Sequence, residues 1–489
     1  MVEVRFTGVQ WTYLQQALSD PWLESKAFLL GTTAQSEDGD LVFYTTEIVA
    51  CLDEHYETRT SASVVIKREY VHGLLTKCEA TGQSLIDVHT HPWQSEAEFS
   101  TIDIQRDLQK FQATEPMYPP FRHGSIVFGK EMNFQGVFYH PAGKKTLPVD
   151  RIKICKLPPE IRLPSGVASE DLSTLQKEIF DRQIRAFGET AQRILSCCTV
   201  VIVGVGGLGS VVASLLALLG VKRLVLVDPD NWDISNSNRL FAINKGAGSG
   251  TLKVEAVRQL LEELCYSRPT VECFPLRFED AEASLKQKPI ELRSLLHADL
   301  IIGCCDSATT RLILNEFACR TLTPYIDLGV GIRTENGKLG AAGGRLRLVV
   351  PGTTPCLVCT GELGPLAARE QRPLVQREIE VRSGYIQGDE EETIHQPQVA
   401  SLNAVIGGLA ANQILKLCTG LPMCANLWYD LLSEQIYSFK PEEPRAGCLH
   451  CDPDGLLGKG FQEVGTELPT MLVPVESEPS EEVPHGNSV

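Results

Sequence analysis

The sequence contains no apolar run long enough to span a membrane, and its first residues lack the basic and apolar regions of a secretory signal. We therefore expect a cytoplasmic protein. Basic residues are also in deficit, because 45 Lys and Arg stand against 62 Asp and Glu, for a formal net charge of −17. Non-specific nucleic-acid binding depends on phosphate neutralisation by Lys and Arg, so this balance argues against that function.

Length and composition predict several folded domains. A chain of 489 residues, 43% of them hydrophobic and 22% charged, is too long for one ordinary core. We expect an α/β domain over 1–150, a Pro-rich linker over 151–170, a second α/β domain over 171–455 and a tail over 456–489. The tail is rich in Glu, Pro and Ser, so we expect it to be disordered. Sixteen cysteines in a cytoplasmic chain indicate core thiols and metal ligands rather than disulfides.

The second domain is expected to contain a nucleotide-binding unit. The β-branched run Val200 to Val203 predicts a buried parallel strand, followed by a glycine loop and an apolar helix. Glycines permit a tight turn and let backbone N–H groups approach a phosphate at the positive end of a helix. A second strand, Arg223 to Val227, ends at Asp228 and Asp230, where a ribose-binding acid is expected. The loop glycines are Gly204, Gly206, Gly207 and Gly209.

The segments that follow the glycine loop resemble the ubiquitin-activating-enzyme superfamily, and most closely the ThiF/MoeB-like adenylating enzymes of thiamine and molybdopterin biosynthesis. The resemblance covers residues 175–453 and rests on D-P-D, I-S-N-S-N-R, G-T-L-K-V-E and C-C-D-S. It implies a Rossmann-like domain that binds ATP and Mg²⁺ and adenylates the C-terminal glycine of a ubiquitin-like β-grasp protein. A nicotinamide-dependent oxidoreductase is the alternative for the glycine unit alone, but it gives these other segments no function.

The resemblance also implies a role for individual side chains. Adenylation places negative charge on phosphate oxygens, so catalysis needs positioning and cations. The implied cations are Arg239, Lys253 and Arg182, the last on a helix expected over Leu172 to Phe187 and reaching the ATP of a partner subunit in a homodimer. Asp306 would hold Mg²⁺, Asp230 would bind the ribose, and Asn236 would lie near the phosphates.

Two C-x-x-C pairs predict a structural zinc site in the same domain. Four thiolates from two knuckles form a closed tetrahedral site. The related adenylating enzymes carry two such pairs in the same places. The predicted ligands are Cys356, Cys359, Cys448 and Cys451.

The segment between these pairs lacks a residue that thioester-forming relatives carry. Their crossover loop usually contains a nucleophilic cysteine, whereas residues 383–399 contain none. Cys418 ends the helix expected over 400–417, where the negative end of the helix dipole opposes thiolate formation, and Cys424 follows shortly after it. We therefore predict adenylation, with transfer to either a sulfur donor or a separate conjugating enzyme.

The first domain contains a pattern typical of a catalytic zinc site. His89 and His91 stand two residues apart at the end of the apolar strand that begins at Ser84, so both imidazoles face the same side. Asp103 follows and is a natural third ligand. Three protein ligands leave the fourth position open for water. A surface H-x-H pair with unrelated acids is the alternative.

H-T-H-P followed by F-S-T-I-D resembles the JAMM (MPN-type) metallopeptidases, which cleave ubiquitin-like proteins from targets or trim their tails. The resemblance implies that Ser100 stabilises the oxyanion and that Glu24, ahead of an apolar strand ending in glycine, deprotonates the zinc-bound water. The spacing from His91 to Asp103 is one residue longer than usual in that family, and Ala27 replaces a customary glycine. A longer surface loop costs little entropy.

Together the two resemblances predict a bifunctional enzyme acting on one partner. The first domain would cleave at the C-terminus of a ubiquitin-like protein, and the second would adenylate the glycine carboxylate. The alternative is a non-catalytic adaptor that binds a ubiquitin-like protein through degenerate domains, but every metal and phosphate position carries a competent residue.

Overall fold

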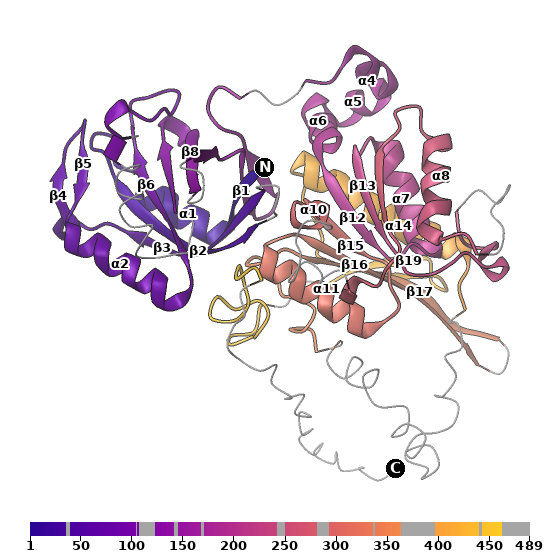
Figure 1. The fold of residues 1–489 in the computed structure, drawn as a ribbon. Helices are drawn as coiled ribbons and strands as arrows, with labels where there is room; N and C mark the ends of the chain where they lie inside the picture. The colour runs from indigo at the N-terminus through magenta and orange to yellow at the C-terminus, as the bar shows by residue number, and fades with distance from the viewer. Residues whose placement is uncertain are drawn as a thin grey trace, which may run out of the picture.

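The computed structural model contains two α/β units, joined by the segment between residues 162 and 174 (Figure 1). It describes residues 1–35, 40–103, 105–106, 123–140, 145–167, 171–241, 250–280, 293–335, 338–361, 363, 397–439 and 443–461. Among these, no helix is long and apolar enough to cross a membrane. The predicted cysteine-free loop, up to residue 396, lies outside the described residues. The disordered tail predicted over 456–489 needs correction at its start, because Leu456 and Leu457 are buried and the Gly458 N–H donates to the Cys319 carbonyl at 3.0 Å. The rest of the predicted tail, from residue 462, lies outside the described residues.

The first unit is built on a nine-stranded mixed sheet with the order β11-β10-β1-β3-β2-β6-β7-β8-β9. Its strands are β1 Val2–Thr7, β2 Lys26–Gln35, β3 Leu41–Ala50, β6 Ser84–Thr90, β7 Gly124–Phe128, β8 Phe134–His140, β9 Lys145–Pro148, β10 Arg151–Cys155 and β11 Glu160–Arg162. A separate hairpin pairs β4 Tyr56–Arg59 with β5 Val64–Ile66. The two longest helices among the described residues of this unit are α1 Gly8–Ala17 and α2 Arg68–Thr81.

Alternation along β2 places its apolar side chains on both faces of this sheet. Leu29 packs in the same core as Trp11 and Leu14 of α1, whereas Leu30 packs with Leu74 of α2. Each helix therefore covers a different face. The apolar strand expected to begin at Ser84 is confirmed as β6, and the one expected after Glu24 is confirmed as β2.

The linker predicted over 151–170 needs correction in its first part. Residues Arg151–Cys155 form β10, which pairs in parallel with β1 inside the sheet, and Glu160–Arg162 form β11 at its edge. Ile152 and Ile154 are fully or almost fully buried, so this stretch carries the alternating pattern of a strand. The prolines that suggested a linker lie after β10, at 158, 159 and 164.

The second unit is built on an eight-stranded sheet with the order β14-β13-β12-β15-β16-β17-β18-β19. The first five strands run parallel, and the last three continue antiparallel. The strands are β12 Thr199–Val203, β13 Arg223–Val227, β14 Thr270–Phe274, β15 Leu300–Gly303, β16 Tyr325–Glu335, β17 Lys338–Val349, β18 Asn426–Asp430 and β19 Gln435–Ser438. The helices are α4 Thr174–Ile179, α5 Asp181–Phe187, α6 Glu189–Cys197, α7 Gly207–Leu219, α8 Lys253–Leu264, α10 Arg293–Leu296, α11 Ala308–Thr321 and α14 Ala400–Thr419.

Helices cover both faces of the parallel part of this sheet. Val200 and Ile202 pack with α7, α8 and α14, whereas Val201 and Val203 pack with α11 and with the cysteine knuckles. This two-sided burial explains why these strands read as continuous apolar runs. The helix expected over 172–187 is two helices, because Phe180 both ends α4 and precedes α5.

The two units share a buried polar interface. Arg5 of β1 donates from Nη1 to the Thr321 carbonyl oxygen at 2.5 Å and to Thr323 Oγ1 at 2.9 Å. Lys153 of β10 lies 2.6 Å from Asp299, and its burial lowers its pKa to about 8. Tyr44 of β3 also packs in the core that contains Val201 and Phe317. The two units therefore contact each other directly, beyond their covalent connection.

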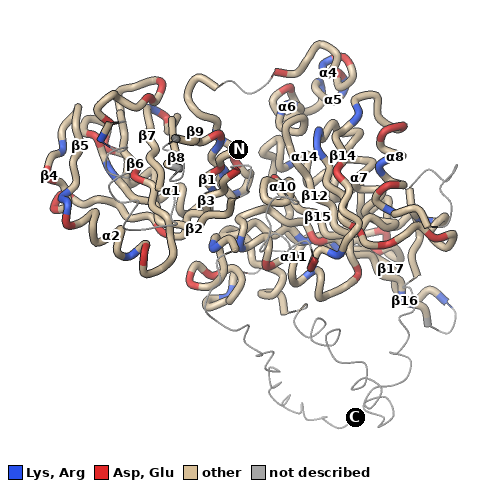
Figure 2. Tube along the Cα trace, in the orientation of Figure 1, with Lys and Arg blue, Asp and Glu red and all other residues tan. Residues whose placement is uncertain are grey.

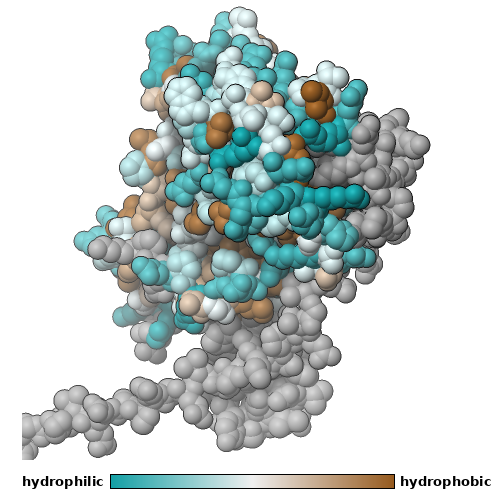
Figure 3. All heavy atoms as spheres, turned by 90° about the vertical axis from the view of Figure 1, so that its left-hand side faces the viewer, coloured by the Kyte–Doolittle hydropathy of each residue, from teal (hydrophilic) through white to brown (hydrophobic). Residues whose placement is uncertain are grey.

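Charges of both signs are spread over both units (Figure 2), and the face of the first unit that Figure 3 shows is largely hydrophilic. Lys and Arg alternate with Asp and Glu along both units (Figure 2). The outer face of the first unit is mostly hydrophilic, with hydrophobic residues scattered singly (Figure 3). The absence of nucleic-acid binding stays a prediction.

Candidate functional sites

The end of β6 brings three of the predicted metal ligands together. Nε2 of His89 and Nε2 of His91 each lie 3.6 Å from the same oxygen, Oδ2 of Asp103. Both imidazoles are buried, at 2% and 5% exposure. In a tetrahedral zinc site, bonds of about 2.0–2.2 Å place N and O ligand atoms about 3.4 Å apart. The donor set and its spacing therefore fit zinc.

Two hydrogen bonds hold Asp103 in this position. Its Oδ2 accepts from the Ser100 hydroxyl at 2.5 Å and from the Ser100 backbone N–H at 2.9 Å. Burial raises the pKa of Asp103, but the adjacent imidazole of His89 and the hydrogen bonds from Ser100 outweigh burial and hold that pKa below its usual range. The carboxylate is therefore ionised at neutral pH. Ser100, expected beside the oxyanion, orients a ligand in this structure.

Glu24 lies two residues before β2, and its side chain is beside the same imidazoles. Its Oε1 is 3.7 Å from His91 Nε2, and the residue is 4% exposed. Burial raises the pKa of its carboxyl from the usual value, although His91 opposes the shift. A carboxyl with a raised pKa that faces a candidate metal is suited to general base catalysis.

The backbone of Glu24 is held from both sides by the β4–β5 hairpin. Its N–H donates to the Thr60 carbonyl at 3.0 Å, and its carbonyl accepts from Arg59 Nε at 3.2 Å. Arg59 also donates to Asp20 Oδ2 and to Ser25 Oγ, each at 3.0 Å. One guanidinium thus fixes the predicted base and two residues near it, a role that the sequence did not reveal.

In the second unit, β12 leads into the predicted glycine loop, which packs against the turn after β15. Gly204 has a φ of +85°, and a Cβ there would lie 2.9 Å from the Cys304 backbone. A Cβ on Gly209 would lie 2.0 Å from the Gly204 carbonyl oxygen. Both positions therefore require glycine. Gly206 and Gly207 complete the loop, and α7 begins at Gly207.

The two acids after β13 have different surroundings. Buried Asp228 accepts from the backbone N–H of Val205 in the loop at 2.7 Å, and burial raises its pKa. Asp230 is exposed, and its Oδ2 accepts from Lys253 Nζ at 2.6 Å. Asp228 therefore holds the loop, whereas Asp230 and Lys253 form an ion pair at the start of α8.

Of the other predicted site residues in this unit, Arg239 lies beside the glycine loop and Asp306 lies next to residues that contact it. Arg239 is adjacent, because a Cβ on Gly207 would meet its Cγ at 3.2 Å. Asn236 accepts from the Asp233 N–H at 3.2 Å and caps a short 3₁₀ turn, Ile234–Asn236. Asp306 is exposed in the turn after β15, beside the cysteine backbone that Gly204 contacts. Arg182 is exposed on α5, and its predicted contact with a partner subunit stays a prediction.

The four predicted cysteine ligands form one cluster. Cys356 Sγ lies 3.8 Å from Cys359 Sγ and 3.7 Å from Cys448 Sγ, and Cys359 Sγ lies 3.5 Å from Cys451 Sγ. A tetrahedral zinc with bonds of about 2.3 Å places its sulfurs about 3.8 Å apart. The cluster therefore fits zinc, and its four thiolates leave no position open.

The comparison with protein families decides the class of the second unit. The model of the ThiF family matches residues 180–450, a range that holds the glycine loop, Lys253, Asp306 and the first three cysteines. The chain belongs to the ThiF family. The match begins at residue 180, so the interpretation of residues 1–150 as a peptidase stays a prediction that rests on the site described above.

Curated relatives of this ThiF family member share about a third of its residues over part of its length. It is 32% identical over 183 residues to ubiquitin-like modifier-activating enzyme 5 of Oryza sativa subsp. japonica, covering 36% of this chain and 41% of the relative. The enzyme of that name from Arabidopsis thaliana is 27% identical over 277 residues, covering 53% and 58%. The chain thus spans between two fifths and three fifths of the length of these relatives.

Solved structures similar to this ThiF family member include E. coli MccB with ATP. That chain shares 19% identity, with a TM-score of 0.43, over 56% of this chain and 74% of MccB. PaaA shares 20% identity, with a TM-score of 0.42, over 57% of this chain and 86% of PaaA.

A buried ion pair beside the ThiF site was missed by the sequence reasoning. Arg311 of α11 donates to both carboxylate oxygens of Asp327 in β16, at 2.8 and 2.6 Å, and the Tyr325 hydroxyl donates to Oδ1 at 2.9 Å. Asp327 is paired in register with Gly303, just ahead of the turn that carries Asp306. A lone aspartate inside an apolar strand was the available signal.

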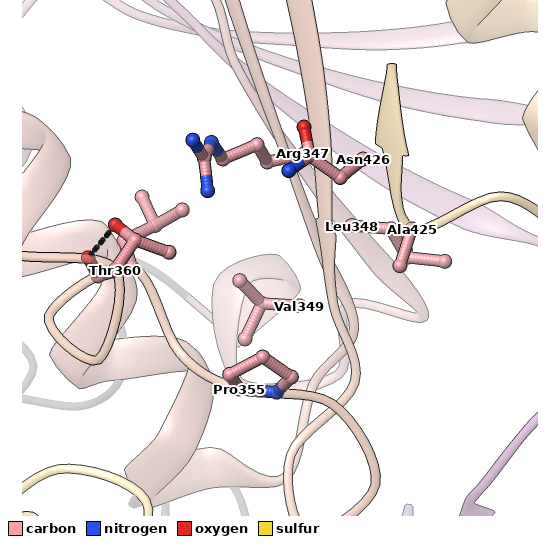
Figure 4. Close-up of a pocket in the computed structure, with 8 residues that line it drawn as sticks. Arg347, Leu348, Val349, Pro355, Thr360, Ala425 and Asn426 are labelled. Carbon is pink, nitrogen blue, oxygen red and sulfur yellow. Dashed lines mark hydrogen bonds between the residues drawn. The ribbon is translucent and has the colours of Figure 1, made fainter. Parts of the chain in front are cut away.

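A small pocket lies in a different part of the ThiF unit, beside the first cysteine knuckle (Figure 4). Its lining residues are Arg347, Leu348, Val349, Pro355, Leu357, Thr360, Ala425 and Asn426. They come from β17, from the turn that carries Cys356 and from the start of β18. None of the predicted nucleotide-binding residues lines it.

Proposed function

We propose that residues 171–455 use ATP and Mg²⁺ to adenylate the C-terminal glycine of a ubiquitin-like protein. Membership of the ThiF family is the observation that carries this proposal, and the names of the curated relatives support it. The juxtaposed glycine loop, Lys253 and Arg239 supply the donors and cations that the chemistry needs.

The proposed reaction joins the modifier carboxylate to the α-phosphate and releases pyrophosphate. Backbone N–H groups of the loop and the N-terminus of α7 would receive the phosphates. Lys253 and Arg239 would then offset the charge that develops on the phosphate oxygens. Asp306 would hold Mg²⁺, which supplies charge neutralisation on the triphosphate, and Asp230 would bind the ribose once Lys253 turns towards the phosphates.

For residues 1–150 we propose a JAMM-type peptidase that cleaves at the C-terminus of the same partner. The convergence of His89, His91 and Asp103 with the carboxyl of Glu24 supports this proposal. Zinc, when bound, would supply an acidified water as nucleophile. Glu24 would accept its proton and pass it to the leaving amine, and the Ser100 hydroxyl would help to orient the ligand set.

The two activities together suggest a sequence of events. The peptidase would expose a glycine carboxylate or remove the modifier from a target, and the ThiF unit would then activate that carboxylate. The acyl group of the adenylate would pass to a sulfur donor or to a separate conjugating enzyme, with release of AMP. We further propose that the protein is a cytoplasmic homodimer and that the Cys356 cluster holds a structural zinc.

ATP–pyrophosphate exchange tests the adenylation proposal. With a candidate β-grasp modifier ending in Gly-Gly, the wild-type chain should support exchange, and Lys253→Ala and Asp306→Ala should each reduce it at least a hundredfold. Lys222→Ala, on the exposed turn before β13, is the matched control and should exchange at the wild-type rate. A non-catalytic adaptor would bind the modifier without exchange in any variant.

A further inference from the structure

The buried imidazole of His91 has a polar partner on the side that faces away from the candidate metal. Its Nδ1 lies 3.0 Å from Oε1 of Gln94, three residues further along the chain. The backbone supports this turn, because the Gln94 N–H donates to the His91 carbonyl at 3.0 Å. The Lys130 N–H donates to the Gln94 carbonyl at 2.8 Å, which ties the turn to the segment after β7.

A second hydrogen bond determines which end of the Gln94 amide faces His91. The same Oε1 accepts from the backbone N–H of Glu98 at 3.2 Å. A backbone N–H can only donate, so the atom that it contacts must be the amide oxygen rather than the nitrogen. The amide oxygen in turn can only accept, so Nδ1 of His91 must carry the proton.

This protonation leaves the Nε2 lone pair of His91 free on the side of Asp103 and Glu24. Neutral imidazole with its free nitrogen aimed at the ion is the form that binds a metal. His89 differs, since neither of its ring nitrogens has a hydrogen-bond partner among the described residues. Of the two histidines, His91 is therefore the preorganised ligand.

We infer that Gln94 is a positioning residue for the metal in the first unit, acting by fixing the tautomer and ring orientation of His91. This inference rests on the proposed peptidase function, because it needs a metal at His89, His91 and Asp103. Outer hydrogen-bond partners of a ligand histidine typically change metal affinity or activity by about 10- to 100-fold. Gln94 is half-buried and would act on a bound metal only through His91.

The test measures Zn²⁺ affinity by competition with a chromophoric chelator, on the full chain. Gln94→Leu, which removes the acceptor, should weaken the first-unit site by about 10- to 100-fold. Gln94→Glu keeps an acceptor for the Nδ1 proton of His91. This variant should therefore bind Zn²⁺ at least as tightly as the wild type does. Gln16→Leu, on the exposed face of α1, is the control and should match the wild type.

A second readout needs no metal and separates positioning from misfolding. In metal-free protein, ¹⁵N spectra of labelled histidine should show His91 as the Nδ1–H tautomer in the wild type and as a mixture of tautomers in Gln94→Leu. Equal Zn²⁺ affinity in Gln94→Leu and wild type, or an Nε2–H tautomer in the wild type, would overturn the inference. If the wild type binds no more zinc than His89→Ala/His91→Ala, the peptidase proposal itself is wrong.

Discussion

The two candidate metal sites of this chain differ in how many positions the protein fills. The cysteine cluster supplies four sulfurs from two knuckles, and their separations of 3.5–3.8 Å match a complete tetrahedron. The site at the end of β6 supplies two imidazoles and one carboxylate, with the Glu24 carboxyl beside them. A site filled by protein can only stabilise structure, whereas a site with an open position can activate water.

The surroundings of the two sites extend this difference. The cysteine knuckles pack in the core of the ThiF unit with Phe317 and Leu357. The ligands of the first-unit site are instead oriented by polar side chains, namely Ser100 for Asp103 and Gln94 for His91. Loss of a cysteine should therefore damage the fold, whereas loss of a first-unit ligand should damage chemistry alone.

The largest expected effect comes from removing one thiolate ligand from the cysteine cluster. Cys356→Ser should lower the free energy of unfolding of the ThiF unit by about 5 kcal/mol or more, because the binding energy of a structural zinc is folding energy. Chemical denaturation with zinc analysis measures it. Cys197→Ser, an exposed cysteine at the end of α6, should leave stability unchanged. A stable Cys356→Ser protein with unaltered zinc content would remove the structural assignment.

Chelation should separate the two sites without any mutation. A chelator of intermediate strength should remove one zinc per chain and abolish cleavage of a β-grasp modifier that carries extra residues after Gly-Gly. ATP–pyrophosphate exchange should persist, because the buried thiolates retain their ion. His89→Ala/His91→Ala should reproduce the chelated state, with one zinc per chain instead of two. Parallel loss of both activities would show that the sites are not distinct in the way we propose.

Removal of the proposed base should affect catalysis and leave the metal in place. Glu24→Gln should reduce turnover of the same substrate by about 10²- to 10⁴-fold, because the glutamine cannot accept the proton of the attacking water. Zinc content and KM should stay near the wild-type values. Glu96→Gln, an exposed carboxylate in the same segment as the ligands, is the matched control. If Glu24→Gln retains wild-type turnover, another group is the base.

The sequence predicted most of the ligands because each set follows a local rule. Side chains alternate along a strand, so His89 and His91, two residues apart, lie on the same side. The C-x-x-C spacing brings two cysteines together within one knuckle. Strand β12, the glycine loop and helix α7 were likewise predicted from apolar periodicity and glycine spacing, and they are confirmed.

The positioning residues could not be predicted, because their contacts join segments that are distant in the chain. Arg59 donates a hydrogen bond to the Glu24 carbonyl, 35 residues earlier in the chain. Arg311 of helix α11 donates to Asp327 of strand β16. Strand β10 was missed for a related reason, since its partner is β1 at the opposite end of the unit. Gln94 is close in sequence to His91, yet its role depends on the bond from Glu98 that orients its amide.

The smallest expected effect comes from Arg59, which holds the backbone of Glu24 beside the first-unit site but is not a predicted metal ligand. Arg59→Ala should reduce turnover about tenfold, because the Glu24 backbone loses one of its two anchors while zinc and its ligands stay in place. Arg59→Lys should recover only part of this loss, because an ammonium group cannot reproduce the forked contacts to Glu24, Asp20 and Ser25. Arg68→Ala, at the exposed start of α2, serves as the control.

The decisive measurement for Arg59 is its coupling to Glu24. If Arg59 acts only by placing Glu24, then Arg59→Ala added to Glu24→Gln should cause no further loss of turnover, because the base that it positions is already absent. Independent, multiplicative losses would instead mean that Arg59 supports the hairpin or the substrate. In that case the site at the end of β6 would depend on the surrounding fold, as the cysteine cluster does. The two sites would then differ only in the number of ligands that the protein supplies.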